Sequence, residues 1–349
     1  MKSIVGNSAD DVWRQAFAEM HTQGLLQHSR DQPTRELLHV SVTITDSRQR
    51  LVFARPINPA FALAEVIWIL SGSNSSEFVQ FWNPPMARYA DTDPAILHGA
   101  YGFRLGSQPT LSKKAEARLR IVQGVPQFRI DQLKQAQAAL EGAPHSRQVV
   151  LQIWDHEKDL PDPQPKSHDI PCNIMSHLMI RQGKLEWLQV MRSNDLMWGT
   201  PYNFIQFTTL QEIVAGWLGV DVGHYCHISD SLHMYQRHWE TEPVAGSPST
   251  LVNTSDLRFQ GYPQWEALWS RLVDRVLDLM DSQEPNEIAA LGAETTDFPP
   301  AYGEWIAVLA AEALRKLRAD SRAHDLIDRA GPYWSDSWKL WCAEQQKRG

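Results

Sequence analysis

Four apolar runs in the middle of the chain constrain its fold more than any other feature. We interpret all four as strands, because they are short and rich in β-branched or alternating apolar residues: RQVVLQIW (147–154), IMSHLMIR (174–181), LEWLQVMRS (185–193) and YCHISDSLHMY (225–235). A helix is expected from about Phe204 to Leu218, since the apolar pattern stops at Gly219. Residues 37–46 predict a further strand. We therefore expect an α/β (α+β) fold with helices packed on a sheet.

Two helices are predicted in the first part of the chain. The first covers residues 9–28 and begins after Ser8-Ala9-Asp10. The second covers residues 58–71 and begins with Asn58-Pro59, a capping residue followed by a proline in the first turn. Glu65 falls inside the second helix, where a carboxylate among apolar residues costs free energy unless it is paired, protonated or used in chemistry.

After about Thr250 the pattern changes to amphipathic helices joined by Pro/Gly turns. These helices are expected at about residues 263–281, 302–320 and 335–346. We therefore expect an α/β body of residues 1–250 and a helical C-terminal extension of residues 251–349 packed on it.

Composition excludes several classes of function. With 349 residues, 43% of them hydrophobic, the chain can bury a large core. Its net charge of −8, without any Lys/Arg block, argues against nucleic-acid binding. No apolar stretch is long enough to span a bilayer, and the first residues do not resemble a secretory leader. The three widely spaced cysteines predict free thiols in the cytoplasm: Cys172, Cys226 and Cys342.

Chemically useful side chains gather beside the ends of the predicted strands. Pro171-Cys172-Asn173 lies between a proline-rich loop (159–169) and an apolar strand, where a thiol is both held and reachable. A lone cysteine carries little weight, because most cysteines have no chemical role. Arg192-Ser193-Asn194-Asp195 and Gly199-Thr200-Pro201-Tyr202-Asn203 add Arg, Asp and Asn side chains near the same strands, and together these motifs favour a site.

With His233-Met234-Tyr235, these motifs resemble the thymidylate synthase family, which also includes nucleotide hydroxymethylases. The family's order is Pro-Cys, Arg-Ser-x-Asp, Gly-x-Pro-[Phe/Tyr]-Asn and His-x-Tyr, and the chain has all four in that order. Three upstream segments are similar to further family motifs: Ala64-Glu65-Val66-Ile67-Trp68, Tyr101-Gly102-Phe103-Arg104 and Ser146-Arg147. The resemblance covers about residues 25–240. It implies a mixed β-sheet flanked by helices, with the catalytic domain in residues 1–250.

The resemblance implies transfer of a one-carbon unit to C5 of a pyrimidine nucleoside 5′-monophosphate. Because C5 is a poor nucleophile, the Cys172 thiolate first adds to C6, and methylenetetrahydrofolate, the co-substrate, then supplies the carbon. Arg192 would have two roles, lowering the pKa of the Cys172 thiol and binding the phosphate. Glu65 would transfer protons through water, and its apolar helix predicts a raised pKa. Tyr101 is placed among the catalytic residues.

Further residues would bind the nucleotide. Asn203 would accept a hydrogen bond from N3–H and donate one to O4, which favours a dUMP-type substrate, whereas a carboxylate there would suit cytosine. His233 and Tyr235 lie two residues apart, share one side of a strand and would bind the ribose 3′-hydroxyl. Arg30 and Arg147 are matched to the phosphate site, to which a second subunit of a homodimer contributes, and Ser193 to a phosphate or base contact.

Two residues would bind the folate. Asp195 would accept hydrogen bonds from the pterin ring, which is rich in N–H donors. Trp82 resembles the tryptophan that packs over the transferred carbon. Simpler roles stay open for several of these residues: an ordinary ion pair for Arg192 or Glu65, a helix cap for Asn203, a core position for Trp82, and a surface position for Arg30, whose alignment competes with that of Arg35.

The cluster His224-Tyr225-Cys226-His227 invites a metal interpretation. Its ligands are too crowded for the usual zinc spacings, and strand alternation sends His224 and Cys226 to one face and His227 to the other. We therefore expect no metal site.

Several positions depart from the family pattern. Asn173 stands where many members have His, and Gln148 where they have a second arginine. The final residues, 345–349, do not resemble the family's apolar terminal segment. Capture of the intermediate by water gives a hydroxymethyl group and hydride transfer from folate gives a methyl group, and both stay open. A catalytically inactive nucleotide-binding protein is the alternative. A Cys/His hydrolase fits poorly, because no motif near Cys172 supplies a base.

Overall fold

The structure, a computed structural model, describes residues 2–29, 32–90, 93–119, 130–160, 169–244, 251–259 and 261–348. The chain forms two compact units. The sheet unit comprises Met1–Ile57, Leu133–Leu160 and Pro171–Val252, and the helical unit comprises Asn58–Gln132, Pro161–Ile170 and Asn253–Gly349. The C-terminal helices therefore group with residues 58–132, while the division expected near residue 250 stays a prediction.

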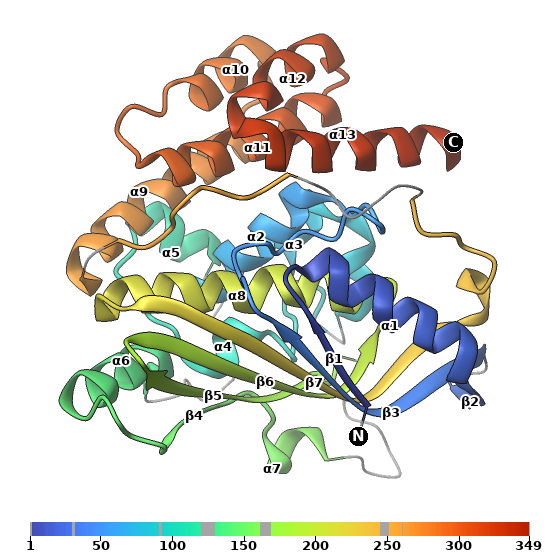
Figure 1. Cartoon of the computed structure of the whole chain (residues 1–349). Helices are drawn as coiled ribbons and strands as arrows, with labels where there is room; N and C mark the ends of the chain where they lie inside the picture. Colours follow the sequence, from blue (N-terminus) through green and yellow to red (C-terminus); the bar gives the residue numbers. More distant parts are fainter. Residues whose placement is uncertain are drawn as a thin grey trace. The chain divides into compact units, whose positions relative to one another are not determined.

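The sheet unit is built on a mixed sheet of seven strands (Figure 1). The strands are β1 (Lys2–Gly6), β2 (Leu25–Ser29), β3 (Gln32–Ile44), β4 (Val149–Gln152), β5 (Asn173–Arg181), β6 (Lys184–Asp195) and β7 (Asp221–Tyr235). Their order is β1-β3-β7-β6-β5-β4, with β2 paired to β3. The pairs β1–β3 and β6–β7 are parallel, and the others are antiparallel. The mixed sheet expected from the sequence is confirmed.

The helices of the sheet unit differ in part from the predicted ones. They are α1 (Ala9–Gln23), α6 (Gln132–Gly142), α7 (His156–Asp159), α8 (Gly199–Leu218) and the 3-10 helix η2 (Gln236–His238). Ser8 caps α1, accepting a hydrogen bond from the Asp11 amide at 3.1 Å. The prediction of a helix to residue 28 is wrong. The chain turns extended at Gly24, where a Cβ would lie 2.4 Å from the Met20 carbonyl oxygen, and continues as β2.

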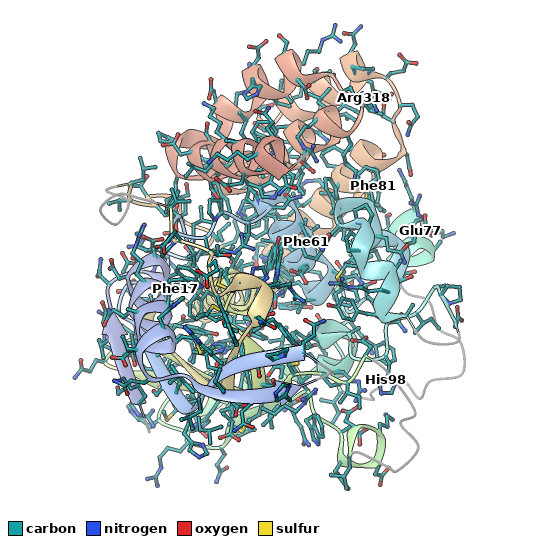
Figure 2. All side chains as sticks on the ribbon, turned by 90° about the vertical axis from the view of Figure 1, so that its right-hand side faces the viewer. Phe17, Phe61, Glu77, Phe81, His98 and Arg318 are labelled. Atoms are coloured by element: carbon teal, nitrogen blue, oxygen red, sulfur yellow. The ribbon has the colours of Figure 1, made fainter. Side chains whose placement is uncertain are left out.

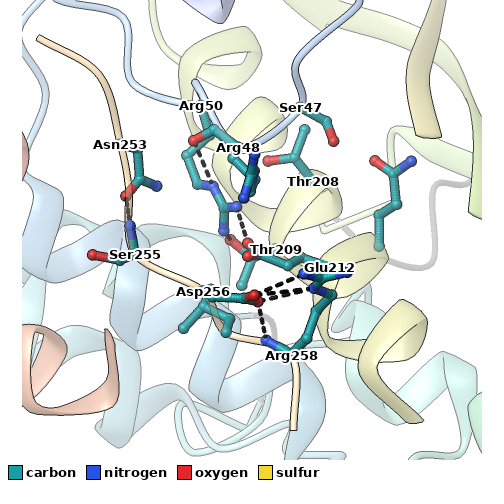
Figure 3. A network of polar contacts seen from close by, with 12 residues as sticks. Ser47, Arg48, Arg50, Thr208, Thr209, Glu212, Asn253, Ser255, Asp256 and Arg258 are labelled. Atoms are coloured by element: carbon teal, nitrogen blue, oxygen red, sulfur yellow. Dashed lines mark hydrogen bonds and ion pairs between the residues drawn. The ribbon is translucent and has the colours of Figure 1, made fainter. Parts of the chain in front are cut away.

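Helix α8 packs against β6 and β7 and lies across one face of the sheet (Figure 1). It is buried on nearly all sides, including polar residues in its middle. Glu212 forms a fully buried ion pair with Arg50, and the Arg50 guanidinium also donates to Thr209 Oγ1 at 2.8 Å (Figure 3). A buried charge needs such partners. This network therefore holds the segment around Arg50 against α8.

An irregularity near the end of β7 changes which side chains are buried. Tyr225, His227 and Ser229 are buried in the first part of the strand, whereas Leu232 and Met234 are buried in the last part. Opposite this point, His39 of β3 has a positive φ of 54°, as in a β-bulge. The shift of one residue leaves His233 and Tyr235 partly exposed at the strand end.

The helical unit contains the remaining helices. They are α2 (Pro59–Leu70), α3 (Ser76–Trp82), η1 (Pro84–Tyr89), α4 (Tyr101–Leu105), α5 (Lys113–Leu119), α9 (Tyr262–Asp281), α10 (Pro285–Ala293), α11 (Pro300–Lys316), α12 (Asp320–Ile327), η3 (Asp328–Ala330) and α13 (Gly331–Arg348). The helix predicted over 302–320 ends at Lys316, because Arg318, labelled in Figure 2, adopts a left-handed conformation with φ 58°. The extension predicted as helical is helical.

The C-terminal helices hold α2 at both ends. The Asn58 Oδ1 atom caps α2, accepting from the Ala60 and Phe61 amides at 3.0 and 3.2 Å, while its Nδ2 atom donates to Glu312 of α11 at 3.4 Å. At the other end, Trp269 Nε1 of α9 donates to Ser71 Oγ at 3.3 Å. Phe61, labelled in Figure 2, is buried in the same helix. The predicted bounds of α2 are correct to within one residue at each end.

Candidate active site at the sheet edge

Three strands bring most of the predicted site residues to one edge of the sheet. Cys172 immediately precedes β5, which runs antiparallel to β6, while Asp195 ends β6. Strand β7 is parallel to β6 and ends at Tyr235, so its end lies at the same edge. Helix α8 starts four residues after Asp195, and Asn203 follows in its first turns. The sequence motifs therefore meet at this edge because of strand order and direction.

Cys172 and Arg192 are neighbours across this edge. The Arg192 amide donates to the Cys172 carbonyl oxygen at 2.9 Å, and its Nε atom donates to the Pro171 carbonyl oxygen at 3.0 Å. The guanidinium also lies over the Trp154 ring, 5.4 Å from the ring centroid. Cys172 is a partly exposed free thiol. A cation is thus held on the segment that carries the thiol.

Asn173, the residue after the thiol, is fully buried. Its Oδ1 atom accepts a hydrogen bond from Gln189 Nε2, and Gln189 in turn accepts from Ser176 Oγ at 2.7 Å and Trp187 Nε1 at 3.2 Å. The Asn173 Nδ2 atom has no hydrogen-bond partner among the described residues. This amide network anchors the start of β5 and thereby the backbone next to Cys172.

His233 and Tyr235 lie side by side at the end of β7, as their spacing predicts. Their ring centroids are 5.2 Å apart at an interplanar angle of 90°. His233 Nδ1 is 3.4 Å from Ser193 Oγ, and the Arg237 guanidinium lies 4.7 Å from the Tyr235 ring centroid. Ser193, His233 and Tyr235 therefore form one polar cluster across β6 and β7.

Asp195 shapes the turn between β6 and α8. Its Oδ1 atom accepts hydrogen bonds from the amides of Met197 at 2.8 Å and Trp198 at 3.2 Å. Among the described residues, the carboxylate oxygens of Asp195 accept no other hydrogen bond. Trp198 itself is partly exposed, donates to His238 Nε2 at 3.0 Å and stacks under the Arg55 guanidinium at 4.6 Å.

Asn203 is not a helix cap. Helix α8 begins at Gly199, with Trp198 as its N-cap, so Asn203 lies inside the helix. Its Nδ2 atom donates to Asn194 Oδ1 at 3.0 Å. Asn194 Nδ2 then donates to His227 Nε2 at 2.9 Å. A buried amide chain thus runs from Asn203 into the sheet.

His227 and Tyr225 end this amide chain. The Tyr225 hydroxyl and His227 Nδ1 are 2.8 Å apart, and both residues are buried. Burial lowers the pKa of His227 to about 3 and raises that of the Tyr225 hydroxyl well above its ordinary value. Both side chains are therefore uncharged near neutral pH.

Three predicted site residues belong to the helical unit. Glu65 lies in α2 and is partly exposed, Trp82 ends α3 and is buried, and Tyr101 begins α4. Helix α4 is fitted closely to the end of α2: a Cβ on Gly102 would lie 2.0 Å from the Ile69 carbonyl oxygen. Tyr101 and Glu65 are therefore carried by two helices in direct contact. Their relation to Cys172 stays a prediction.

The predicted phosphate residues are less defined. Arg147 is exposed just before β4, and its carbonyl oxygen lies 3.1 Å from His177 Nε2. Arg30 lies outside the described residues. Where the chain is described, no group of three or more His, Cys, Asp or Glu side chains is arranged to hold a metal ion. In the same residues, no helix is both long and apolar enough to cross a membrane.

Sequence reasoning missed three residues that the fold places beside the predicted ones: Asn194, His227 and Trp198. Asn194 lies inside the Arg-Ser-Asn-Asp motif, which assigns it no role, and the sequence suggests for His227 only a metal interpretation that its spacing disfavours. No local signal links them, because Asn194 and His227 lie 33 positions apart and meet only through the pairing of β6 with β7.

Comparison with known proteins adds independent observations. The family model described as thymidylate synthase matches residues 13–246. A deoxyuridylate hydroxymethyltransferase of Bacillus phage SP01 is 32% identical over 238 residues, which are 67% of this chain and 59% of that protein. A deoxyuridylate hydroxymethyltransferase of Pseudomonas phage M6 is 31% identical over 265 residues, 73% of this chain and 69% of that protein. A thymidylate synthase of Bacillus phage phi3T is 25% identical over 244 residues, 68% of this chain and 77% of that protein.

Proposed function

Because the chain belongs to the thymidylate synthase family, we propose that it transfers a one-carbon unit from methylenetetrahydrofolate to C5 of deoxyuridylate. The observation that carries the proposal is the meeting of Cys172, Arg192, Asp195 and Asn203 at one sheet edge. Each group matches one need of this reaction. In the same order, these residues would supply a nucleophile, a cation beside it, a hydrogen-bond acceptor for the folate and an amide for the base.

The protein's own residues carry the steps around the nucleotide. The Cys172 thiolate adds to C6, which makes C5 nucleophilic, and Arg192 favours the ionised thiol while binding the phosphate with Arg147 and Arg30. Asn203 holds the uracil edge, and Ser193, His233 and Tyr235 hold the sugar and phosphate. Glu65 and Tyr101 move the protons that must leave C5 and reach the ring oxygen. The folate would supply the carbon, with Asp195 and Trp82 as its contacts, and would leave as tetrahydrofolate once C5 has lost its proton. Addition of water to the C5 methylene and elimination of Cys172 from C6 would then release the product.

The product we propose is 5-hydroxymethyl-deoxyuridylate. The relatives named deoxyuridylate hydroxymethyltransferase are 32% and 31% identical to this chain, against 25% for a relative named thymidylate synthase. Capture of the C5 methylene by water needs a polar, hydrated site, whereas hydride transfer needs water excluded. Asn173, the buried residue that follows Cys172 in the sequence, has an amide nitrogen that lacks a partner among the described residues, and this polar group supports the water route.

We further propose a homodimer in the cytoplasm. A shared phosphate site would take arginines from both subunits, and three free cysteines suit a reducing compartment. Mixing inactive Arg147→Ala and Cys172→Ala proteins should restore part of the activity through hybrid dimers.

One assay tests the function. The protein is incubated with methylenetetrahydrofolate and each of dUMP, UMP, dCMP and CMP, and both the mass of the nucleotide and the formation of dihydrofolate are recorded. We expect a hydroxymethyl group on dUMP without dihydrofolate. A methyl group with stoichiometric dihydrofolate would overturn the product, and binding without any change in mass would favour the inactive nucleotide-binding protein.

A further inference from the structure

The Asn203 amide can offer its hydrogen-bond acceptor and donor to a base in only one orientation. Its side chain is buried, and its Nδ2 atom already gives one hydrogen to Asn194 Oδ1 at 3.0 Å. An amide nitrogen donates and cannot accept, so Oδ1 and the second N–H of Asn203 are left for a ligand. A uracil edge, with N3–H and O4, fits this order of acceptor and donor. A cytosine edge, with N3 as acceptor and a 4-amino donor, fits only the reversed amide.

Asn194 decides the polarity of Asn203. Its Oδ1 atom receives the Asn203 hydrogen, and its Nδ2 atom faces two acceptors, His227 Nε2 at 2.9 Å and Ser229 Oγ at 3.4 Å. Gly199 leaves the space for this contact, since a Cβ there would lie 2.7 Å from Asn194 Oδ1. Reversal of Asn203 would force Asn194 to turn as well and would set its oxygen against His227 Nε2.

His227 in turn fixes Asn194. Burial keeps the imidazole neutral, so one ring nitrogen accepts and the other carries the hydrogen. Because Nε2 accepts from Asn194, the hydrogen is on Nδ1 and is donated to the Tyr225 hydroxyl oxygen at 2.8 Å. The Phe204 ring packs edge-on to the His227 ring at 5.5 Å and 86°, which holds the imidazole in place. The tautomer with its hydrogen on Nδ1 is the one that matches the donor and acceptor order of both amides.

We infer that Tyr225, His227 and Asn194 are positioning residues that select uracil over cytosine by locking the amide of Asn203 in one orientation. The inference rests on the proposed function, because it assumes that Asn203 faces the base. It goes beyond that function in assigning base discrimination to residues that do not touch the nucleotide. A purely structural role would lower affinity for both bases alike, whereas a locking role changes their ratio.

The test is the ratio of the dCMP and dUMP dissociation constants, measured by calorimetry on the intact protein. Tyr225→Phe removes the acceptor of the Nδ1 hydrogen, which frees the histidine to change tautomer, and His227→Phe removes the acceptor of Asn194. Each substitution should lower the ratio of the dCMP to the dUMP dissociation constant by roughly tenfold or more, which corresponds to the free energy of one hydrogen bond. Thr208→Val is the matched control, because it deletes a buried hydroxyl of α8 whose one hydrogen bond within the described part of the chain is to the Phe204 carbonyl at 2.6 Å.

The outcomes separate the two proposals. An unchanged ratio in folded Tyr225→Phe protein and in folded His227→Phe protein, or a wild-type protein that binds dCMP as well as dUMP, overturns the locking role. If His227→Phe does not fold, the Tyr225→Phe protein, which loses a single oxygen, decides alone. Preferential dUMP binding without product formation would contradict the proposed reaction, and the ratio test would stand unaffected.

Discussion

Arg192 is joined to the segment that carries Cys172 by two hydrogen bonds, one from its backbone amide and one from its side chain. The amide donates to the Cys172 carbonyl oxygen at 2.9 Å, and Nε donates to the Pro171 carbonyl oxygen at 3.0 Å. The guanidinium is therefore held against the backbone that carries the thiol. A guanidinium can donate in several directions at once, which is the property that the proposed double role of Arg192 requires.

Substitution Arg192→Lys should lower kcat/KM for the nucleotide by roughly tenfold or more, although the positive charge is kept. A lysine cannot donate to the Pro171 carbonyl and bind an anion with a planar fork at the same time. Steady-state kinetics with dUMP measure the effect. Arg181→Lys, on the same sheet but outside the proposed site, is the control and should behave as wild type. Equal kinetics of both variants would argue against the role of Arg192.

Asn203→Asp should shift preference from dUMP toward dCMP. A carboxylate can only accept hydrogen bonds. It can therefore accept from the 4-amino group of cytosine, whereas with uracil it accepts from N3–H but loses the donor to O4. The ratio of kcat/KM for the two nucleotides should change by roughly a hundredfold or more, because the variant loses one contact and gains another. A variant that keeps the wild-type ratio would show that Asn203 does not face the base.

Stability should fall on the acid side because His227 is buried and neutral. Burial lowers its pKa from 6.5 to about 3. Between these values the unfolded chain binds a proton that the folded protein does not. Stability is therefore fully present above pH 6.5 and lost as the pH falls, by about 1.4 kcal/mol per pH unit for this one group.

Urea unfolding between pH 4 and 6.5 (about the window of the His227 shift) measures this slope in wild-type and His227→Gln protein. The unfolded variant binds one proton fewer in this pH range, so its free energy of unfolding should fall less steeply as the pH is lowered. His224→Gln, a change at an exposed histidine of the same strand, is the control and should keep the wild-type slope. Parallel slopes for all three proteins would mean that His227 titrates normally.

Glu312→Leu should destabilise the protein by about 2–4 kcal/mol. The buried Glu312 carboxylate accepts from Arg315 at 2.8 Å, from Trp338 at 3.3 Å and from Asn58 at 3.4 Å, so its loss removes an acceptor that three side chains share. Chemical denaturation gives the value. Glu344→Leu removes an ion pair to Lys347, whose side chain is largely exposed, and should cost less than about 1 kcal/mol. Similar losses of stability in both variants would contradict the conclusion that Glu312 holds the start of α2.

Features encoded by neighbouring residues could be predicted from the sequence. The start of α2 follows from Asn58-Pro59 and the end of α8 from Gly219, because caps act over one helical turn. The end of α1 could not be predicted in this way. Leu25 and Leu26 continue the apolar pattern of the helix, and the extended turn at Gly24 leads them into a strand that only pairing with β3 explains.

The candidate site likewise contains residues that local motifs predict and contacts that only the fold creates. Cys172, Arg192, Asp195 and Asn203 each lie in a short motif, so their grouping was expected from the sequence. The bond between Asn194 and His227 depends on the register of β6 against β7, which no local pattern specifies. Contacts of this kind became visible only in the fold.

The central claim is that Cys172 attacks the pyrimidine ring. A 5-fluoro analogue of dUMP tests it directly, because fluorine cannot leave C5 as a proton does and the covalent intermediate accumulates. The protein is incubated with the analogue and methylenetetrahydrofolate, digested and analysed by mass spectrometry. The predicted result is an adduct of nucleotide and folate on the peptide that contains Cys172, and none in Cys172→Ser protein. An unmodified Cys172 peptide, or an adduct on Cys226 or Cys342, would contradict the account.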